Sequence, residues 1–127
     1  MEMVKNAVNW IEIPVKNFDR AKLFYQMIFN YDMPETPMGP NRMGMLLYDQ
    51  PGGGVGGAIV AGESYEPTPS GSLVYLNGGN DLSVVLGRVE KAGGAVVVPK
   101  TLVAPEIGYF AIFKDCEGNR VGLHSPK

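Results

Sequence analysis

The sequence predicts an α+β fold built from two copies of the same βαβββ module. An apolar strand, an Asn or Asp cap and an amphipathic helix occur near the start and again past the middle. Each copy is followed by short strands separated by turn residues. When the two copies are aligned, Trp10 matches Ser72 and Val15 matches Asn77. This period is long for a solenoid repeat and fits two halves of one domain.

Length and composition favour a single domain. A chain of 127 residues that is 45% hydrophobic can bury one substantial core but not two. We therefore expect one domain over 1–127, with module one at about 5–62, a linker at about 63–70 and module two at about 71–126. The linker is rich in Pro, Ser and Thr and has no periodicity.

Charge and cysteine content exclude several classes of partner. The formal net charge is −2, the pI is about 5.3, and no basic stripe is present, so we expect no nucleic-acid partner. The apolar runs are too short to cross a bilayer, and the first residues lack the layout of a secretory signal. Cys116 is a single cysteine and has no intramolecular partner. We expect a cytoplasmic protein with no membrane partner.

The first module begins with an apolar strand at about 7–15 and continues into a helix at about 18–29. Asn17 is the expected N-cap of this helix. Apolar residues at helical spacing then form one face that covers the sheet. Strands follow at about 43–48 and 55–61, with a weaker candidate at 31–35.

The second module repeats the pattern. A strand ends near Asn77, a helix follows with Asn80 or Asp81 as its cap, and Gly93 and Gly94 end that helix. Later strands are expected at about 95–98, 108–114 and 120–125. A turn at 115–119, in which Gly118 suits a positive φ, joins the last two strands.

Two segments carry a resemblance to a known superfamily. The opening segment runs from Ile13-Pro14-Val15-Lys16-Asn17 into the first helix, and the closing segment is Asp115-Cys116-Glu117-Gly118-Asn119 with the strand after it. Together with the paired modules, these segments resemble the vicinal oxygen chelate superfamily. That superfamily includes glyoxalase I, extradiol dioxygenases and bleomycin-resistance proteins. The resemblance implies a half-open barrel with the helices on its outer face, and a homodimer.

The resemblance also implies four metal-ligand positions, on the first and last strand of each module. In this chain they fall on Trp10, Ser72, Gly122, and Gly57 or Ala58. Divalent metals prefer imidazole or carboxylate donors, which none of these residues supplies. We therefore expect no metal cofactor.

Two residues of the first strand are candidates for the site. The ring of Trp10 would stack on a planar ligand or else plug the barrel. Glu12 lies two residues further on the same face, where it is a candidate general base or polar anchor. The alternative for Glu12 is an ion pair with Arg120 at the rim.

The second module supplies the remaining candidates. His124 lies two residues past Gly122 and would transfer protons near neutral pH, or would simply be solvated. Glu12 and His124 are the one acid–base pair that the sequence offers. Alternation from Ser72 predicts that Tyr75 points toward the helices, and we expect one of Tyr48, Tyr109 and Phe110 to line the pocket.

These observations lead to one function and two alternatives. The leading hypothesis is a glyoxalase/bleomycin-resistance-like protein that binds a small apolar or aromatic molecule in a metal-free cavity. The expected ligand-binding residues are Trp10, Glu12, Ser72, Arg120, Gly122 and His124. The first alternative is a glyoxalase-related lyase or isomerase, with Glu12 and His124 as acid and base or with a divergent metal site. The second is an accessory module whose cavity is filled by its own side chains.

Overall fold

The computed structural model describes all 127 residues and contains the βαβββ order twice. The first module comprises β1 (Trp10–Pro14), α1 (Phe18–Phe29), β2 (Glu35–Met38), β3 (Asn41–Met45) and β4 (Gly56–Ala61). The second comprises β5 (Val74–Asn77), α2 (Ser83–Leu86), α3 (Val89–Ala92), β6 (Ala95–Ala104), β7 (Gly108–Lys114) and β8 (Arg120–Ser125). No helix is both long and apolar enough to cross a membrane.

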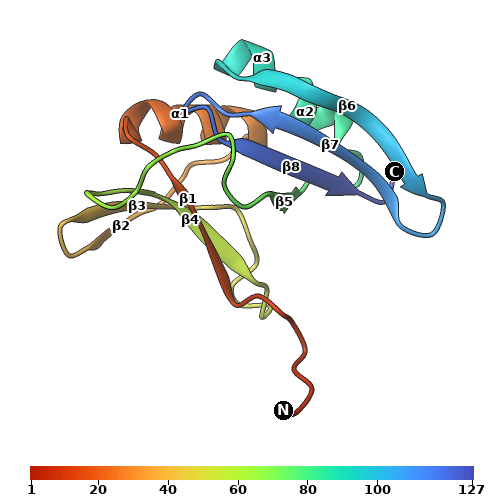
Figure 1. Ribbon diagram of the computed structural model, residues 1–127, viewed down its shortest axis with the longest axis horizontal. Coiled ribbons are helices and arrows are strands. Elements are labelled where there is room, and N and C mark those ends of the chain that lie inside the picture. Colours follow the sequence, from red (N-terminus) through yellow and green to blue (C-terminus); the bar gives the residue numbers. More distant parts are fainter.

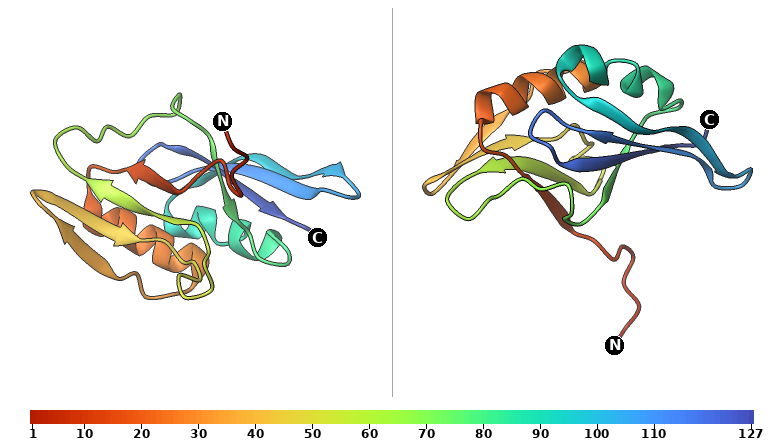
Figure 2. Two further views of the ribbon diagram at one scale, coloured as in Figure 1. Left: turned by 90° about the horizontal axis from the view of Figure 1, so that it is seen from below. Right: turned by 45° about the horizontal axis from the view of Figure 1, so that its top comes forward.

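Each module forms one four-stranded mixed sheet with the same topology. The strand orders are β1-β4-β3-β2 and β5-β8-β7-β6, so the first strand of each module lies at an edge of its sheet and pairs with the last strand in parallel. The two sheets splay apart without closing, and the helices lie together on one side of both (Figures 1 and 2). The predicted α+β fold with a half-open barrel and outer helices is therefore confirmed.

A single hydrophobic core joins the two modules beneath the helices. It contains 17 buried residues contributed by both sheets and all three helices. The ring of Phe24 on α1 lies 6.0 Å from that of Phe113 on β7, so the first helix also packs on the second sheet. Asn17 caps α1 as predicted, because its side chain accepts a hydrogen bond from the amide of Arg20 at 3.1 Å.

Several element boundaries differ from the sequence-based expectation. The strand expected at 31–35 is β2 at Glu35–Met38, because α1 ends in a left-handed residue at Asn30 and a short loop follows. The strand expected at 43–48 is β3 at Asn41–Met45. The expected second helix is divided at Gly87, and β6 continues to Ala104.

Strand pairing corrects the alignment of the two modules. When Asp49 is matched with Asp115, Gly56 corresponds to Gly122, because each glycine lies seven residues after its aspartate. Trp10 pairs with Gly56, and Tyr75 pairs with Gly122. Trp10 therefore corresponds to Tyr75 and not to Ser72, which precedes β5. The expected alignment was wrong by three residues, and an odd shift exchanges the two faces of a strand.

Candidate functional site

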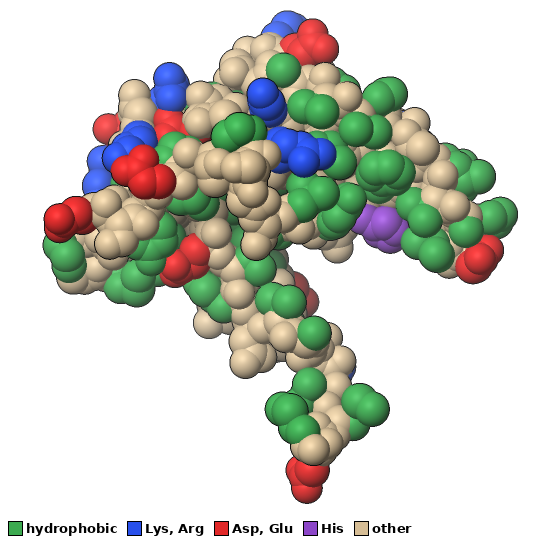
Figure 3. All heavy atoms as spheres, viewed as in Figure 1, with side chains coloured by type: hydrophobic (Ala, Val, Ile, Leu, Met, Phe, Trp, Pro, Cys, Tyr) green, Lys and Arg blue, Asp and Glu red, His purple; other side chains and the backbone are tan.

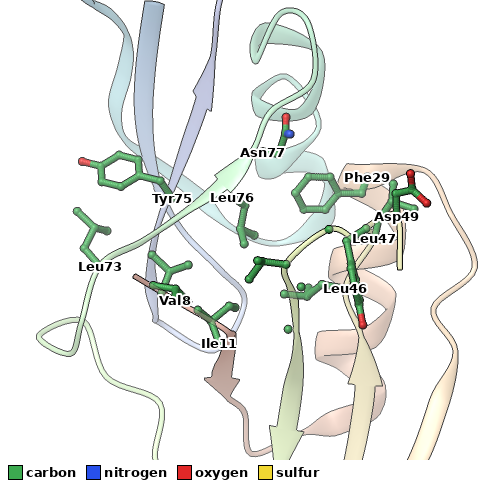
Figure 4. A pocket seen from close by; sticks show the side chains of 16 residues that line it. Val8, Ile11, Phe29, Leu46, Leu47, Asp49, Leu73, Tyr75, Leu76 and Asn77 are labelled. Atoms are coloured by element: carbon green, nitrogen blue, oxygen red, sulfur yellow. The ribbon is translucent and has the colours of Figure 1, made fainter. Parts of the chain in front are cut away.

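An apolar cavity lies along the seam, the line on which β1 and β5 face each other. It has a volume of about 670 Å³, and 11 of its 16 lining residues are hydrophobic. The lining comes from both modules: Val8, Ile11, Phe29, Leu46–Asp49, Gly54–Gly57 and Leu73–Asn77. In Figure 4, Ile11, Phe29 and Leu76 point toward a common space, whereas Tyr75 points away from it. The cavity is not filled by its own side chains, which argues against the accessory-module alternative.

The closing turn of the second module seals the far end of the seam. Asp115 is buried, and its carboxylate accepts four hydrogen bonds, from the Tyr25 hydroxyl at 2.7 Å, the amides of Glu117 and Asn119 at 2.9 Å, and the Asn119 side-chain amide at 3.1 Å. The side-chain amide of Asn119 also donates to the carbonyl of Pro14 at 2.8 Å. This turn therefore ties β8 to both β1 and α1.

The corresponding turn of the first module lacks these side chains. If Asp49 corresponds to Asp115, then Pro51 and Gly53 occupy the positions of Glu117 and Asn119. Asp49 is exposed, and its carboxylate accepts one hydrogen bond, from the amide of Gly52 at 3.0 Å. No side chain of this turn bridges to the loop after β5, and the cavity opens at this end of the seam.

Glu117 extends the closing turn to the start of α1, and its ionisation should make stability depend on pH. Its side chain is 1% exposed, forms an ion pair with Arg20 and accepts hydrogen bonds from the amides of Lys16 and Asn17. Burial alone would raise the pKa of Glu117, but these donors outweigh burial and hold the pKa below its usual 4.5. A carboxylate with a lowered folded-state pKa stabilises the fold above the unfolded-state pKa and loses that contribution as pH falls through the folded-state pKa.

We therefore expect the melting temperature to fall as the pH drops below about 5, and to fall less steeply in Glu117→Gln. The variant should also melt lower than the wild type at neutral pH, because the ion pair with Arg20 is lost. Thermal unfolding followed by circular dichroism at several pH values provides the measurement. Equal slopes in the two proteins would show that Glu117 does not contribute to this pH dependence.

Trp10 and Glu12 lie on the face of the first sheet that points away from the helices. Glu12 accepts hydrogen bonds from the hydroxyl of Tyr65 at 2.8 Å and from the indole N–H of Trp10 at 3.3 Å. It forms no ion pair with Arg120, so that alternative is not observed. The Trp10 ring, 38% exposed, meets the ring of Tyr48 edge-on with 6.2 Å between centroids. Trp10 does not plug the barrel.

Tyr75 lies on the matching face of the second sheet. It is 48% exposed, its ring contacts Phe110 at a centroid distance of 6.3 Å, and it covers the backbone of Gly122. The expectation that Tyr75 packs toward the helices was wrong, because it relied on the three-residue misalignment with Ser72. Of the three aromatic residues whose faces were left open, Tyr48 lines the seam cavity.

His124 lies near the far end of β8, where its Nε2 is 2.8 Å from the carbonyl oxygen of Ile107. Glu12 instead shares a cleft with Arg120, which begins β8. His124 lies four positions after Arg120 along the strand, a distance of about 13 Å. The structure therefore does not bring Glu12 and His124 together as an acid–base pair.

The cleft beside Glu12 collects three of the residues expected at the site. It has a volume of about 240 Å³, lies at the sealed end of the seam, and includes Glu12, Ser72 and Arg120. Trp10, Gly122 and His124 are not part of its lining. The seam cavity contains none of the six expected ligand-binding residues, so the sequence-based site and the seam cavity are different places.

The implied metal positions offer a poor donor set. Strand pairing places Trp10, Tyr75, Gly56 and Gly122 at corresponding positions of the two modules, and Ala58 pairs with Glu12. Gly57 pairs with Ile11 instead. Among the candidate ligand positions Trp10, Tyr75, Gly56, Gly57, Ala58 and Gly122, only the phenol of Tyr75 carries a side-chain donor that metals use. No group of three or more His, Cys, Asp or Glu side chains is placed to hold a metal ion.

Cys116 is a poor candidate for redox chemistry. Its side chain is half-buried, and burial, reinforced by the charge of Asp115, raises the pKa of the thiol to about 11. A nucleophilic cysteine needs the opposite shift, because the thiolate is the reactive form.

The residues of the seam cavity were missed because their place depends on how the modules pack. Leu73 and Leu76 belong to the second module, whereas Leu46 and Val55 belong to the first. One signal was available: the closing sequence at 115–119 is replaced at 49–53 by Asp-Gln-Pro-Gly-Gly. The loss of two bridging side chains at this turn indicates an open end of the seam.

Comparison with known proteins gives a consistent set of neighbours. No protein-family profile matches the chain. A glyoxylase-like domain-containing protein from Didymella fabae is 28% identical over 118 residues, which cover 92% of this chain and 91% of that protein.

Two solved structures from Streptomyces sp. CB03234 are also similar. A glyoxalase/bleomycin resistance protein is 26% identical with a TM-score of 0.64, over 91% of this chain and 97% of the other. TnmS3, an antibiotic binding protein, is 22% identical with a TM-score of 0.66, over 99% of this chain and 100% of the other.

Proposed function

We propose that the chain is a glyoxalase/bleomycin-resistance-like protein that binds a small apolar or aromatic molecule in the seam cavity without a metal ion. Its fold is that of the glyoxalase/bleomycin-resistance structures it resembles. One observation carries this proposal: a cavity of about 670 Å³ remains between the modules with a mainly hydrophobic lining. Cavities of roughly 300–1,000 Å³ with such a lining are typical of small-molecule sites.

The lining also indicates the chemistry of the ligand. Phe29, Leu46 and Leu76 offer apolar contact, and Tyr48 adds an aromatic ring with a polar tip. Asp49 is the one charged residue of the lining, and Figure 4 shows its carboxylate turned away from the central space. An uncharged ligand therefore fits this cavity better than a charged one, because it loses no ionic hydration on entry.

The similar structures support a binding function for this fold. TnmS3 is described as an antibiotic binding protein, and the other Streptomyces neighbour as a glyoxalase/bleomycin resistance protein. Binding of an apolar molecule requires only the cavity. The alternative function, a lyase or isomerase, requires the side chains of Glu12 and His124 to lie close together as acid and base.

A fluorescent titration tests this proposal. N-phenyl-1-naphthylamine is uncharged, aromatic and bright only in apolar surroundings, so wild-type protein should bind it saturably at one site per chain. Naphthalene should displace the dye, whereas naphthalene disulfonate should not. Absence of saturable binding would overturn the proposal.

We further propose that the protein is a cytoplasmic homodimer. The edge strand β6 exposes Val97, Leu102 and Val103, and apolar side chains gather over this end of the molecule in Figure 3. An exposed apolar edge strand favours pairing with a second chain. Sedimentation velocity at micromolar concentration should show a dimer, and a monomer at all concentrations would refute this part.

A further inference from the structure

The cleft beside Glu12, at the sealed end of the seam, contains two opposite charges that do not pair with each other. Glu12 reaches it from β1 and Arg120 from the start of β8. The chain forms six ion pairs, and neither residue takes part in any of them. A carboxylate and a guanidinium therefore line one cleft of about 240 Å³ with no ionic partner in the chain.

Glu12 is held in place and still has acceptor capacity. The hydroxyl of Tyr65 binds one of its oxygens and the indole of Trp10 binds the other. A carboxylate accepts about four hydrogen bonds, so about two acceptor positions remain. The half-buried carboxylate is thus fixed in direction by two aromatic residues, and its open positions suit an ammonium donor.

Arg120 supplies the complementary group on the same side of the molecule. Val121 next to it is buried in the core beneath the helices, so alternation places Arg120 on the opposite face, as it does Glu12 relative to Ile13. No hydrogen bond within the chain uses its guanidinium. The planar fork of Arg matches a carboxylate in a bidentate geometry. Ser72 adds a hydroxyl that is likewise unused within the chain.

We propose that this cleft binds a small zwitterion of the amino-acid class, with its ammonium on Glu12 and its carboxylate on Arg120. The volume is that of about eight waters, which is below the range of drug-sized sites and suits a molecule of this size. The site is separate from the seam cavity, with Val74 as a shared wall, and does not depend on the function proposed for that cavity.

Isothermal titration with compounds of increasing length tests the proposal. The series is glycine, β-alanine, 4-aminobutanoate and 5-aminopentanoate, compared with butylamine and butanoate, which carry one charge each. One member of the series should bind with a Kd of about 1 mM or tighter, and at least about tenfold more tightly than either singly charged compound. Equal affinity for a singly charged compound, or no detectable binding of the whole series, would overturn the proposal.

Two variants and two matched controls locate the binding. Glu12→Gln and Arg120→Met should each weaken binding of the best zwitterion at least about tenfold. Glu63→Gln and Lys91→Met remove the same charges from exposed positions outside the cleft and should change it less than about twofold. Equal losses in the controls would show a general charge effect and refute the site.

The same variants separate this proposal from the one made for the seam cavity. Arg120→Met should bind N-phenyl-1-naphthylamine like the wild type, because Arg120 does not line that cavity. If Glu12→Gln fails to fold, Arg120→Met decides the outcome, since Arg120 is exposed and forms no ion pair within the chain. Unchanged zwitterion binding in Arg120→Met would overturn the proposal.

Discussion

Asp115→Ala should lower the free energy of unfolding by about 3–4 kcal/mol, one of the largest effects of any single substitution in this chain. The carboxylate is buried and receives four hydrogen bonds. Its removal leaves the hydroxyl of Tyr25 and the amides of Glu117 and Asn119 without an acceptor. Urea unfolding followed by circular dichroism, with an unchanged m value, measures the loss.

The internal repeat provides a matched control for this substitution. Asp49 is the corresponding residue of the first module, but it is exposed and its carboxylate accepts one hydrogen bond, from the amide of Gly52. Asp49→Ala should therefore cost less than about 1 kcal/mol. If the two variants lose similar stability, the closing turn is not what fastens the modules together.

The two βαβββ modules, and the difference between their closing turns, could be predicted from the sequence, because the modules are similar enough to compare. The alternation of apolar residues and the cap at Asn17 identified both βαβββ units, and these signals are local. The boundaries of β7 and β8 were also predicted correctly, because glycine and turn residues limit them on both sides.

The alignment between the modules could not be obtained in this way. Strand β5 has only four residues, from Val74 to Asn77, so its pattern barely distinguishes one register from another. A slip of three residues placed Ser72 where Tyr75 lies and reversed the expected face of Tyr75. Only the pairing of Tyr75 with Gly122 fixes the register.

The site was harder to predict than the fold, because its residues meet across modules. Glu12, Ser72 and Arg120 were each expected at a ligand site, and they do share a cleft. Their grouping depends on the packing of β1 against the start of β8, which no local pattern encodes. The same holds for Phe29 and Leu76, which face each other across the seam cavity although they belong to different modules (Figure 4).

Leu76→Trp should abolish binding of N-phenyl-1-naphthylamine, or weaken it at least about 100-fold, if the seam cavity is the binding site. Leu76 points from β5 toward the centre of the cavity, where an indole would occupy the space that the dye requires (Figure 4). A side chain that grows into an existing void causes less strain than one that grows into a packed core, so the fold should survive with a loss of no more than about 1–3 kcal/mol.

Leu23→Trp is the matched control for the blocked cavity, since it makes the same change at an exposed position of α1 outside the cavity. Its dye affinity should equal that of the wild type. Normal binding by Leu76→Trp would mean that the dye occupies another surface, and the apolar ligand proposed for the seam would lose its support. A loss confined to Leu76→Trp would assign binding to the open end of the seam, where the first module lacks the side chains that seal the second.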